Sequence, residues 1–143
     1  MLFRSPNDAG VVRAVGQWAG KPGECAHFEL ATAGAPARLD LAADHTNLAL
    51  GMDLVSIEIR IVDAAGHRVL GAASPISVTV TGPGELVALD NSDPRDVASV
   101  QAGHRTAYQG RILALVRTRA GSEPGPVTVR ASADGLPAAE LRL

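Results

Sequence analysis

The sequence predicts an all-β fold built as a β-sandwich. Short runs in which apolar and polar residues alternate recur along the chain, and Gly or Pro stands in nearly every gap between them. Helical periodicity is almost absent, since only 96–103 could form a helical turn and it lacks a sustained apolar stripe. Roughly seven short strands with turns at intervals of about 8 to 12 residues are typical of an immunoglobulin-like Greek-key sandwich.

The clearest strand is 55–61, where β-branched and polar residues alternate strictly. Because successive side chains of a strand point to opposite faces, this pattern predicts a strand with one buried face. The Asp-x-x-Gly cluster at 63–66 then predicts a turn that reverses the chain. A second alternating run, 76–81, places its hydroxyl groups outside and predicts another strand.

Five shorter runs of the same kind predict further strands at 37–43, 85–89, 111–118, 127–132 and 138–143. The side chains expected inside the sandwich are all apolar: Leu39, Leu41, Val55, Ile57, Ile59, Ile61, Ile76, Val78, Val80, Leu86, Ile112, Ala114, Val116, Val127 and Val129.

The first 35 residues have a different organisation. Two plausible strands, 11–18 and 24–31, are joined through 19–23 into a hairpin with no sheet of its own, which is marginal in water. Residues 32–36, Thr-Ala-Gly-Ala-Pro, predict a short linker. We therefore divide the chain into an incomplete preceding unit, 1–35, and a sandwich domain, 36–143. Unpaired hairpin edges would allow such a fragment to dimerise.

The composition excludes several classes of partner. Lys and Arg number 13 against 15 Asp and Glu, a formal charge of -2 with both signs scattered, so we expect neither nucleic acid nor a membrane surface as a partner. No run approaches the roughly 20 apolar residues of a membrane span. Cys25 is the one cysteine, which excludes an intrachain disulfide and a thiolate cluster.

Aromatic residues are scarce: Phe3, Trp18, Phe28 and Tyr108. Sugar-binding surfaces use flat aromatic side chains to stack on sugar rings, so a carbohydrate-binding module is disfavoured. We expect Trp18 to pack within the hairpin and Tyr108 to close the end of the sandwich.

The densest polar group is Asp90, Asn91 and Asp93, with Asp96 close by. Oxygen ligands in one loop could hold calcium, but their spacing misses the EF-hand pattern. We expect these side chains to bond their own turn instead. The glutamates Glu24, Glu29, Glu58, Glu85, Glu123 and Glu140 fall on polar strand faces or in loops, so we expect no catalytic carboxylate pair, no cofactor and no metal.

Several segments together resemble the C-terminal domains of glycoside hydrolase family 2 proteins, the β-galactosidase and β-glucuronidase group. The residues that carry the likeness are 32–37, 53–66, the Gly-Pro-Gly-Glu-Leu to Asp-Asn-Ser-Asp-Pro stretch 82–94, and 105–116. Residues 10–16 and the hairpin are similar to the closing strands of the domain that precedes it. Ser92 stands where relatives usually carry Gly, so we expect a differently shaped loop there.

The resemblance implies a longer parent with a sugar-binding jelly roll, an immunoglobulin-like domain and a catalytic barrel before residue 1, the barrel carrying both catalytic glutamates. We therefore expect a non-catalytic accessory domain that packs against the other domains of a β-galactosidase-like hydrolase. A periplasmic or extracellular location is favoured by the resemblance alone. The alternative is a free-standing bacterial immunoglobulin-like adhesion or interaction module, which tandem copies upstream would indicate.

Overall fold

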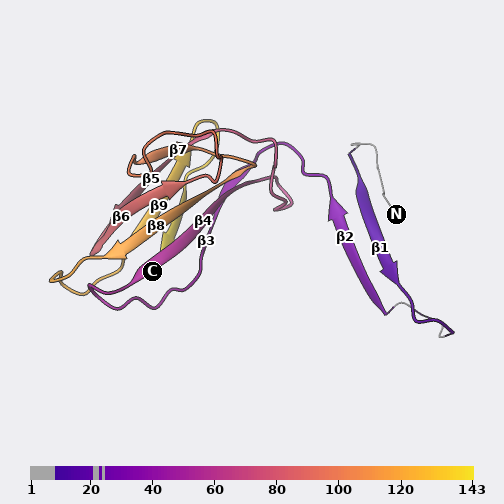
Figure 1. The fold of residues 1–143 in the computed structure, drawn as a ribbon, viewed down its shortest axis with the longest axis horizontal. Coiled ribbons are helices and arrows are strands. Elements are labelled where there is room, and N and C mark those ends of the chain that lie inside the picture. Colours follow the sequence, from indigo (N-terminus) through magenta and orange to yellow (C-terminus); the bar gives the residue numbers. More distant parts are fainter. Residues whose placement is uncertain (1–8, 21–22, 24) are drawn as a thin grey trace.

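The computed structural model describes residues 9–20, 23 and 25–143, and within them it shows ten strands and no helix. Eight strands form two four-stranded sheets that pack face to face, and the other two form a separate ribbon (Figure 1). The all-β sandwich predicted from the alternating runs is confirmed. In this described part, no helix has the length and apolar character needed to cross a membrane.

The first sheet has the order β3-β4-β8-β6 and contains the longest strands. Its strands are β3 (Arg38–Ala43), β4 (Leu54–Val62), β8 (Arg111–Thr118) and β6 (Gly84–Asp90). All neighbours are antiparallel, and the central pair β4 and β8 is in register from Leu54 opposite Arg117 to Arg60 opposite Arg111. Partners in an antiparallel pair share a face, so the apolar positions of β4 and β8 form one continuous inner surface.

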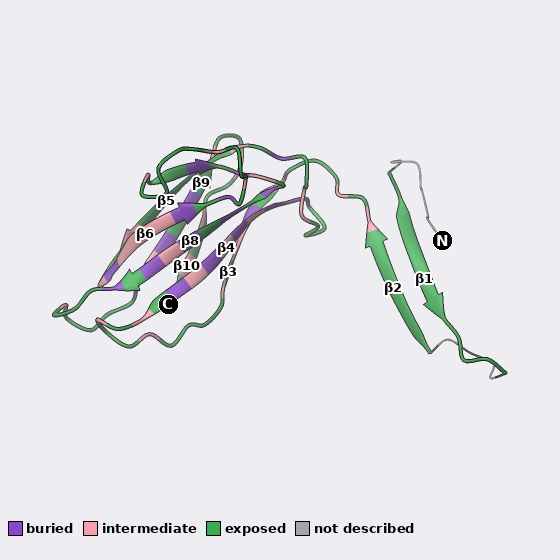
Figure 2. Ribbon diagram, in the orientation of Figure 1, coloured by how far each residue is buried: buried purple, intermediate pink, exposed green. Residues whose placement is uncertain are grey.

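The second sheet has the order β10-β9-β5-β7 and is antiparallel throughout. It consists of β10 (Ala139–Arg142), β9 (Thr128–Ala133), β5 (Pro75–Thr81) and the three-residue β7 (His104–Thr106). Its inner face meets that of the first sheet, and the buried positions of both lie between the two layers (Figure 2).

The core contains the apolar side chains that the alternation placed inside. Ile57, Ile59, Ile76 and Ile112 are among its largest members and are essentially inaccessible to solvent. Of the expected interior residues, Leu41, Val80 and Leu86 are partly buried and pack against the core from its margin, and the others are buried.

Leu89 is fully buried although strict alternation from Leu86 places it on the outer face. The pairing of β6 with β8 explains this, because the register shifts between Leu86 and Ala88. Such a β-bulge inserts an extra residue and reverses the phase of the side chains beyond it. Leu86 and Leu89, three residues apart, therefore both face inward.

Loop 91–103 connects β6 to β7, the edge strands of the two sheets on the same side of the sandwich. It is bonded to both layers: the amide of Leu89 in β6 donates to Val100 O at 2.6 Å, and that of Val78 in β5 donates to Gly103 O at 2.9 Å. The loop contains turns but no helical turn at 96–103.

The ribbon consists of β1 (Val11–Gly16) and β2 (Ala26–Ala31), paired from Val11 opposite Ala31 to Gly16 opposite Ala26. Its strands are exposed along nearly their whole length. The expectation that Trp18 packs within the hairpin is wrong, because Trp18 lies beyond β1 and is 68% exposed. Phe3, and the predicted hairpin positions 21, 22 and 24, lie outside the described residues.

Candidate functional site

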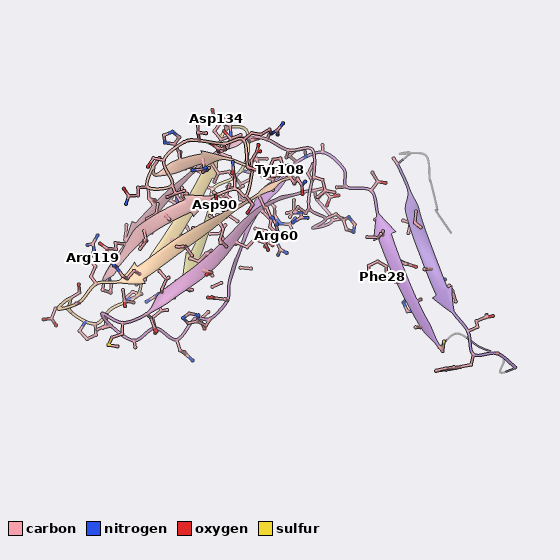
Figure 3. All side chains as sticks on the ribbon, viewed as in Figure 1. Phe28, Arg60, Asp90, Tyr108, Arg119 and Asp134 are labelled. Atoms are coloured by element: carbon pink, nitrogen blue, oxygen red, sulfur yellow. The ribbon has the colours of Figure 1, made fainter. Side chains whose placement is uncertain are left out.

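The sandwich has one end that receives the chain from the hairpin, which we call the linker-side end. Three connections meet there: loop 63–74 after β4, the start of loop 91–103 after β6, and 107–110 between β7 and β8. Tyr108 lies at this end, whereas Arg119 lies at the opposite end (Figure 3). A hollow of about 500 Å³ opens here, lined by Ala73, Asn91, Asp93, Arg95, Asp96, Thr106, Ala107 and Tyr108.

Asn91 lines this hollow and is buried, with 5% of its surface exposed. Its side-chain nitrogen donates to Asp96 Oδ2 at 2.7 Å and to Thr106 O at 2.9 Å, and its Oδ1 accepts from the amide of Asp93 at 3.0 Å. Asn91 therefore joins the start of loop 91–103 to Asp96 within the loop and to Thr106 at the end of β7.

The loop is a succession of turns in which a carboxylate or amide oxygen accepts the backbone N–H two residues on. Asn91 bonds Asp93 in this way, Asp93 bonds Arg95 at 3.0 Å, and Asp96 bonds Ala98 at 2.9 Å. Short polar side chains favour such turns because they replace a backbone acceptor. The Ala98 amide, followed by the Asn91 side chain, holds the pKa of Asp96 below its ordinary value.

Asp93 and Arg95 form an ion pair at the mouth of the hollow, with Arg95 Nε 3.0 Å from Asp93 Oδ1 and Nη2 3.1 Å from Oδ2. This bidentate contact lowers the pKa of Asp93 and raises that of Arg95. The Arg95 guanidinium carbon lies 6.0 Å from the centre of the Tyr108 ring, within the range of a cation–π contact.

Ser92 adopts a left-handed backbone conformation, with φ of 60°. Its hydroxyl lies 3.4 Å from Asp90 Oδ2, and Asp90 itself is exposed. Of the predicted candidates, the structure thus brings Asn91 and Asp93 into one bonded loop with Asp96, while Asp90 lies outside that network. Among the side chains that the structure describes, no three or more His, Cys, Asp or Glu are grouped to hold a metal ion.

Glutamates of the strands are paired with arginines rather than with one another. The pairs are Glu29 with Arg13 at 3.3 Å, Glu58 with Arg111 at 3.3 Å, Glu85 with Arg117, and Glu140 with Arg130 at 2.6 Å. Arg117 lowers the pKa of Glu85 by hydrogen bonding and by its charge. Glu58 borders a second hollow of about 180 Å³ together with Asp90, Asn91 and Arg111. Glu24 lies outside the described residues.

Two residues that organise the linker-side end have contacts that the sequence pattern does not predict. Arg105 of β7 is buried inside the sandwich edge, a position that no alternation marks in a three-residue strand. Asp63 was expected only to form a local turn, but its Oδ2 also accepts the amide of Gly34 in the linker at 2.8 Å. The local Asp-x-x-Gly pattern carries no information about that distant partner.

The two packed antiparallel sheets define an immunoglobulin-like β-sandwich domain. Comparison with known proteins shows its family. A family model described as "Glycoside hydrolase family 2 C-terminal domain 5" matches residues 39–142. The chain therefore belongs to the family of glycoside hydrolase family 2 C-terminal domains.

Known relatives are considerably longer than this chain. The β-galactosidase BoGH2A of Bacteroides ovatus is 28% identical over 144 residues, covering 100% of this chain but 16% of the relative. A crystal structure of a glycosyl hydrolase family 2 member from Bacteroides cellulosilyticus matches with a TM-score of 0.88 and 29% identity, over 96% of this chain and 19% of that one. A β-glycosidase from Bacteroides vulgatus matches with a TM-score of 0.86 and 27% identity, over 97% and 18%.

Proposed function

We propose that this chain is a non-catalytic accessory domain at the C-terminal end of a β-galactosidase-like glycoside hydrolase, where it packs against other domains of the same polypeptide. Membership of the family and the share of 16–19% that the chain covers in its longer relatives support a place within a multidomain protein. Residues 36–143 would form the accessory domain, and residues 1–35 would be the closing strands of the domain before it and the linker.

The observation that carries this proposal is the exposed apolar face of the hairpin. In the register of β1 and β2, Val12 lies opposite Leu30 and Ala14 opposite Phe28, so these four side chains share one face. Val12 and Leu30 are each 60% exposed and Phe28 is 63% exposed. The other face carries the Arg13–Glu29 ion pair.

An apolar ribbon face of this kind needs a cover, because two strands alone are marginally stable in water and exposed apolar patches mark interaction sites. The proposed cover is the remainder of the preceding domain, which would pack against this face and whose sheet would continue along the outer edges of β1 and β2. The sandwich would then stabilise or orient that domain.

The polar groups also support a role without catalysis. Glycoside hydrolysis uses two carboxyl groups that face each other across a bound sugar. Among the described residues, the carboxylates of loop 91–103 bond their own backbone, and the glutamates of the strands lie beside arginines.

The test is an assay of the purified chain with nitrophenyl β-galactosides and β-glucuronides, beside an active family 2 hydrolase in the same buffer. We expect no release of nitrophenol above the buffer rate. Turnover that scales with chain concentration and falls on substitution of a carboxylate of this chain, for example Glu58→Gln, would overturn the proposal. Turnover that Glu58→Gln and the other carboxylate substitutions leave unchanged would identify a contaminating hydrolase.

A further inference from the structure

Hydrogen bonds anchor the chain on both sides of the junction between the hairpin and the sandwich, and a single residue separates the two anchors. At the base of the hairpin, the amide of Thr32 donates to Gly10 O at 2.8 Å, and the amide of Gly10 donates to Thr32 Oγ1 at 3.2 Å. At the edge of the sandwich, the amide of Gly34 donates to Asp63 Oδ2 at 2.8 Å. Ala33 alone stands between these two anchored positions.

Asp63 is itself firmly held, with its side chain 8% exposed. Its Oδ1 accepts the amide of His67 at 2.8 Å, its own amide donates to His67 O at 2.9 Å, and the amide of Gly66 donates to Asp63 O at 3.1 Å. From β3, Arg38 Nη1 donates to Asp63 O at 3.1 Å. The carboxylate that receives the linker is thus part of the sandwich rather than a mobile surface group.

We infer that Asp63 is a positioning residue that fixes the direction in which the hairpin leaves the sandwich. On the proposed function, this direction is also the orientation of the preceding domain relative to the sandwich. The contact itself does not depend on that function, because both of its partners lie within this chain.

Loss of the Asp63–Gly34 bond would lengthen the free segment. The next anchor along the chain is the amide of Ala37, which donates to Val62 O at 2.8 Å. The unanchored stretch would therefore grow from residue 33 to residues 33–36. Because the root-mean-square end-to-end distance of a flexible linker grows as the square root of its length, the spread of distances across the junction should rise about twofold.

The test measures a distance across the junction by double electron–electron resonance. Cys25, the one cysteine, is exposed at the end of the hairpin away from the linker and takes one spin label. A second label is placed on the sandwich through Glu123→Cys, in the exposed loop after β8. We expect a narrow distance distribution in the otherwise unaltered chain and one about twice as wide in Asp63→Ala.

Asp44→Ala is the matched control, because Asp44 Oδ1 also accepts a backbone amide, that of Ser56 at 3.2 Å, but has no bond to the linker. This control should leave the width unchanged. Equal widths in the unaltered chain and in Asp63→Ala, or a broad distribution in both, would overturn the inference.

A second measurement keeps the inference testable if Asp63→Ala unfolds. In the unaltered chain, the Gly34 amide should exchange with deuterium more slowly than the Ala33 amide, and equal exchange would contradict the bond. A failure of either measurement leaves the proposed function standing, since that function is tested by the hydrolysis assay.

Discussion

The guanidinium of Arg105 lies beside the carboxylate of Asp96 inside the edge of the sandwich, with Nε 3.1 Å from Oδ2 and the arginine side chain 3% exposed. Nη1 also donates to Ala98 O at 3.0 Å. Within the described residues, Nε is left without the geometry of a hydrogen bond, so the contact with Asp96 is electrostatic. This one buried cation holds loop 91–103 against the short strand β7.

Substitution Arg105→Ala should lower the free energy of unfolding by about 2–3 kcal/mol, because it removes a buried side chain together with its charged hydrogen bond to Ala98 O and its contact with Asp96. Arg95→Ala is the control, since the Arg95 side chain is 78% exposed and its pair with Asp93 should contribute less than about 1 kcal/mol. Urea denaturation of both variants measures the difference. Equal losses would show that Arg105 does not hold the loop.

Substitution Ser92→Gly should raise the free energy of unfolding by about 0.5–1 kcal/mol, because glycine adopts a φ of 60° without the strain that a Cβ imposes. Ser77→Gly, within β5, should lower it by a similar amount through lost backbone entropy. Thermal denaturation compares the two. A destabilised Ser92→Gly variant would mean that the serine hydroxyl matters more than the backbone.

Substitution Gly110→Ala should lower the free energy of unfolding by about 3 kcal/mol or more, since a left-handed conformation and a clash with backbone act together. Gly110 has φ of 71°, and a Cβ there would lie 2.3 Å from Val69 O. At Gly135, φ is 75° and a Cβ would meet nothing within 4 Å, so Gly135→Ala should cost only about 1–2 kcal/mol. Denaturant titrations compare the two variants. Similar losses of stability would contradict the prediction, because they would show that loop 63–74 moves away from the added Cβ at no energetic cost.

Acid stability should depend on Asp63. The amide of Gly34, followed by that of His67, lowers the pKa of this carboxyl from 3.8 to about 2. The unfolded chain then binds more protons than the folded one between these values, so the stabilisation is complete above about pH 5 and is lost progressively as the pH falls through 3.8 towards 2.

The measurement for Asp63 is the free energy of unfolding from pH 6 to pH 2. Asp63→Asn should show a shallower decline below pH 4 than the unaltered chain, whose Asp93 and Asp96 also titrate there. Parallel declines would exclude a contribution from Asp63.

The strands were predictable wherever one face is buried along a whole run. The alternation at 55–61 and at 76–81 matches β4 and β5 to within a residue at each end. Because one face of such a strand is buried, apolar residues recur at every second position, and this alternation is visible in the sequence. The same reasoning does not identify Leu89 as a core residue, because the bulge in β6 changes the phase without any local sign.

The polar contacts of the linker-side end were predictable only in part. Asn91 and Asp93 lie in the turns that their residue types favour, because such bonds span two residues. Asp63 and Gly34 are 29 residues apart, and Arg105 bonds Ala98 across a folded loop. Contacts of this kind follow from the packing of the sheets and leave no local pattern.

The most direct test of the accessory role compares the whole proposed hydrolase with a version that ends at residue 35. We expect the shortened protein to hydrolyse nitrophenyl glycosides with the same kcat per correctly folded molecule, but to unfold at a lower temperature. A large loss of kcat with an unchanged unfolding temperature would contradict this account, because the sandwich would then contribute to the chemistry itself.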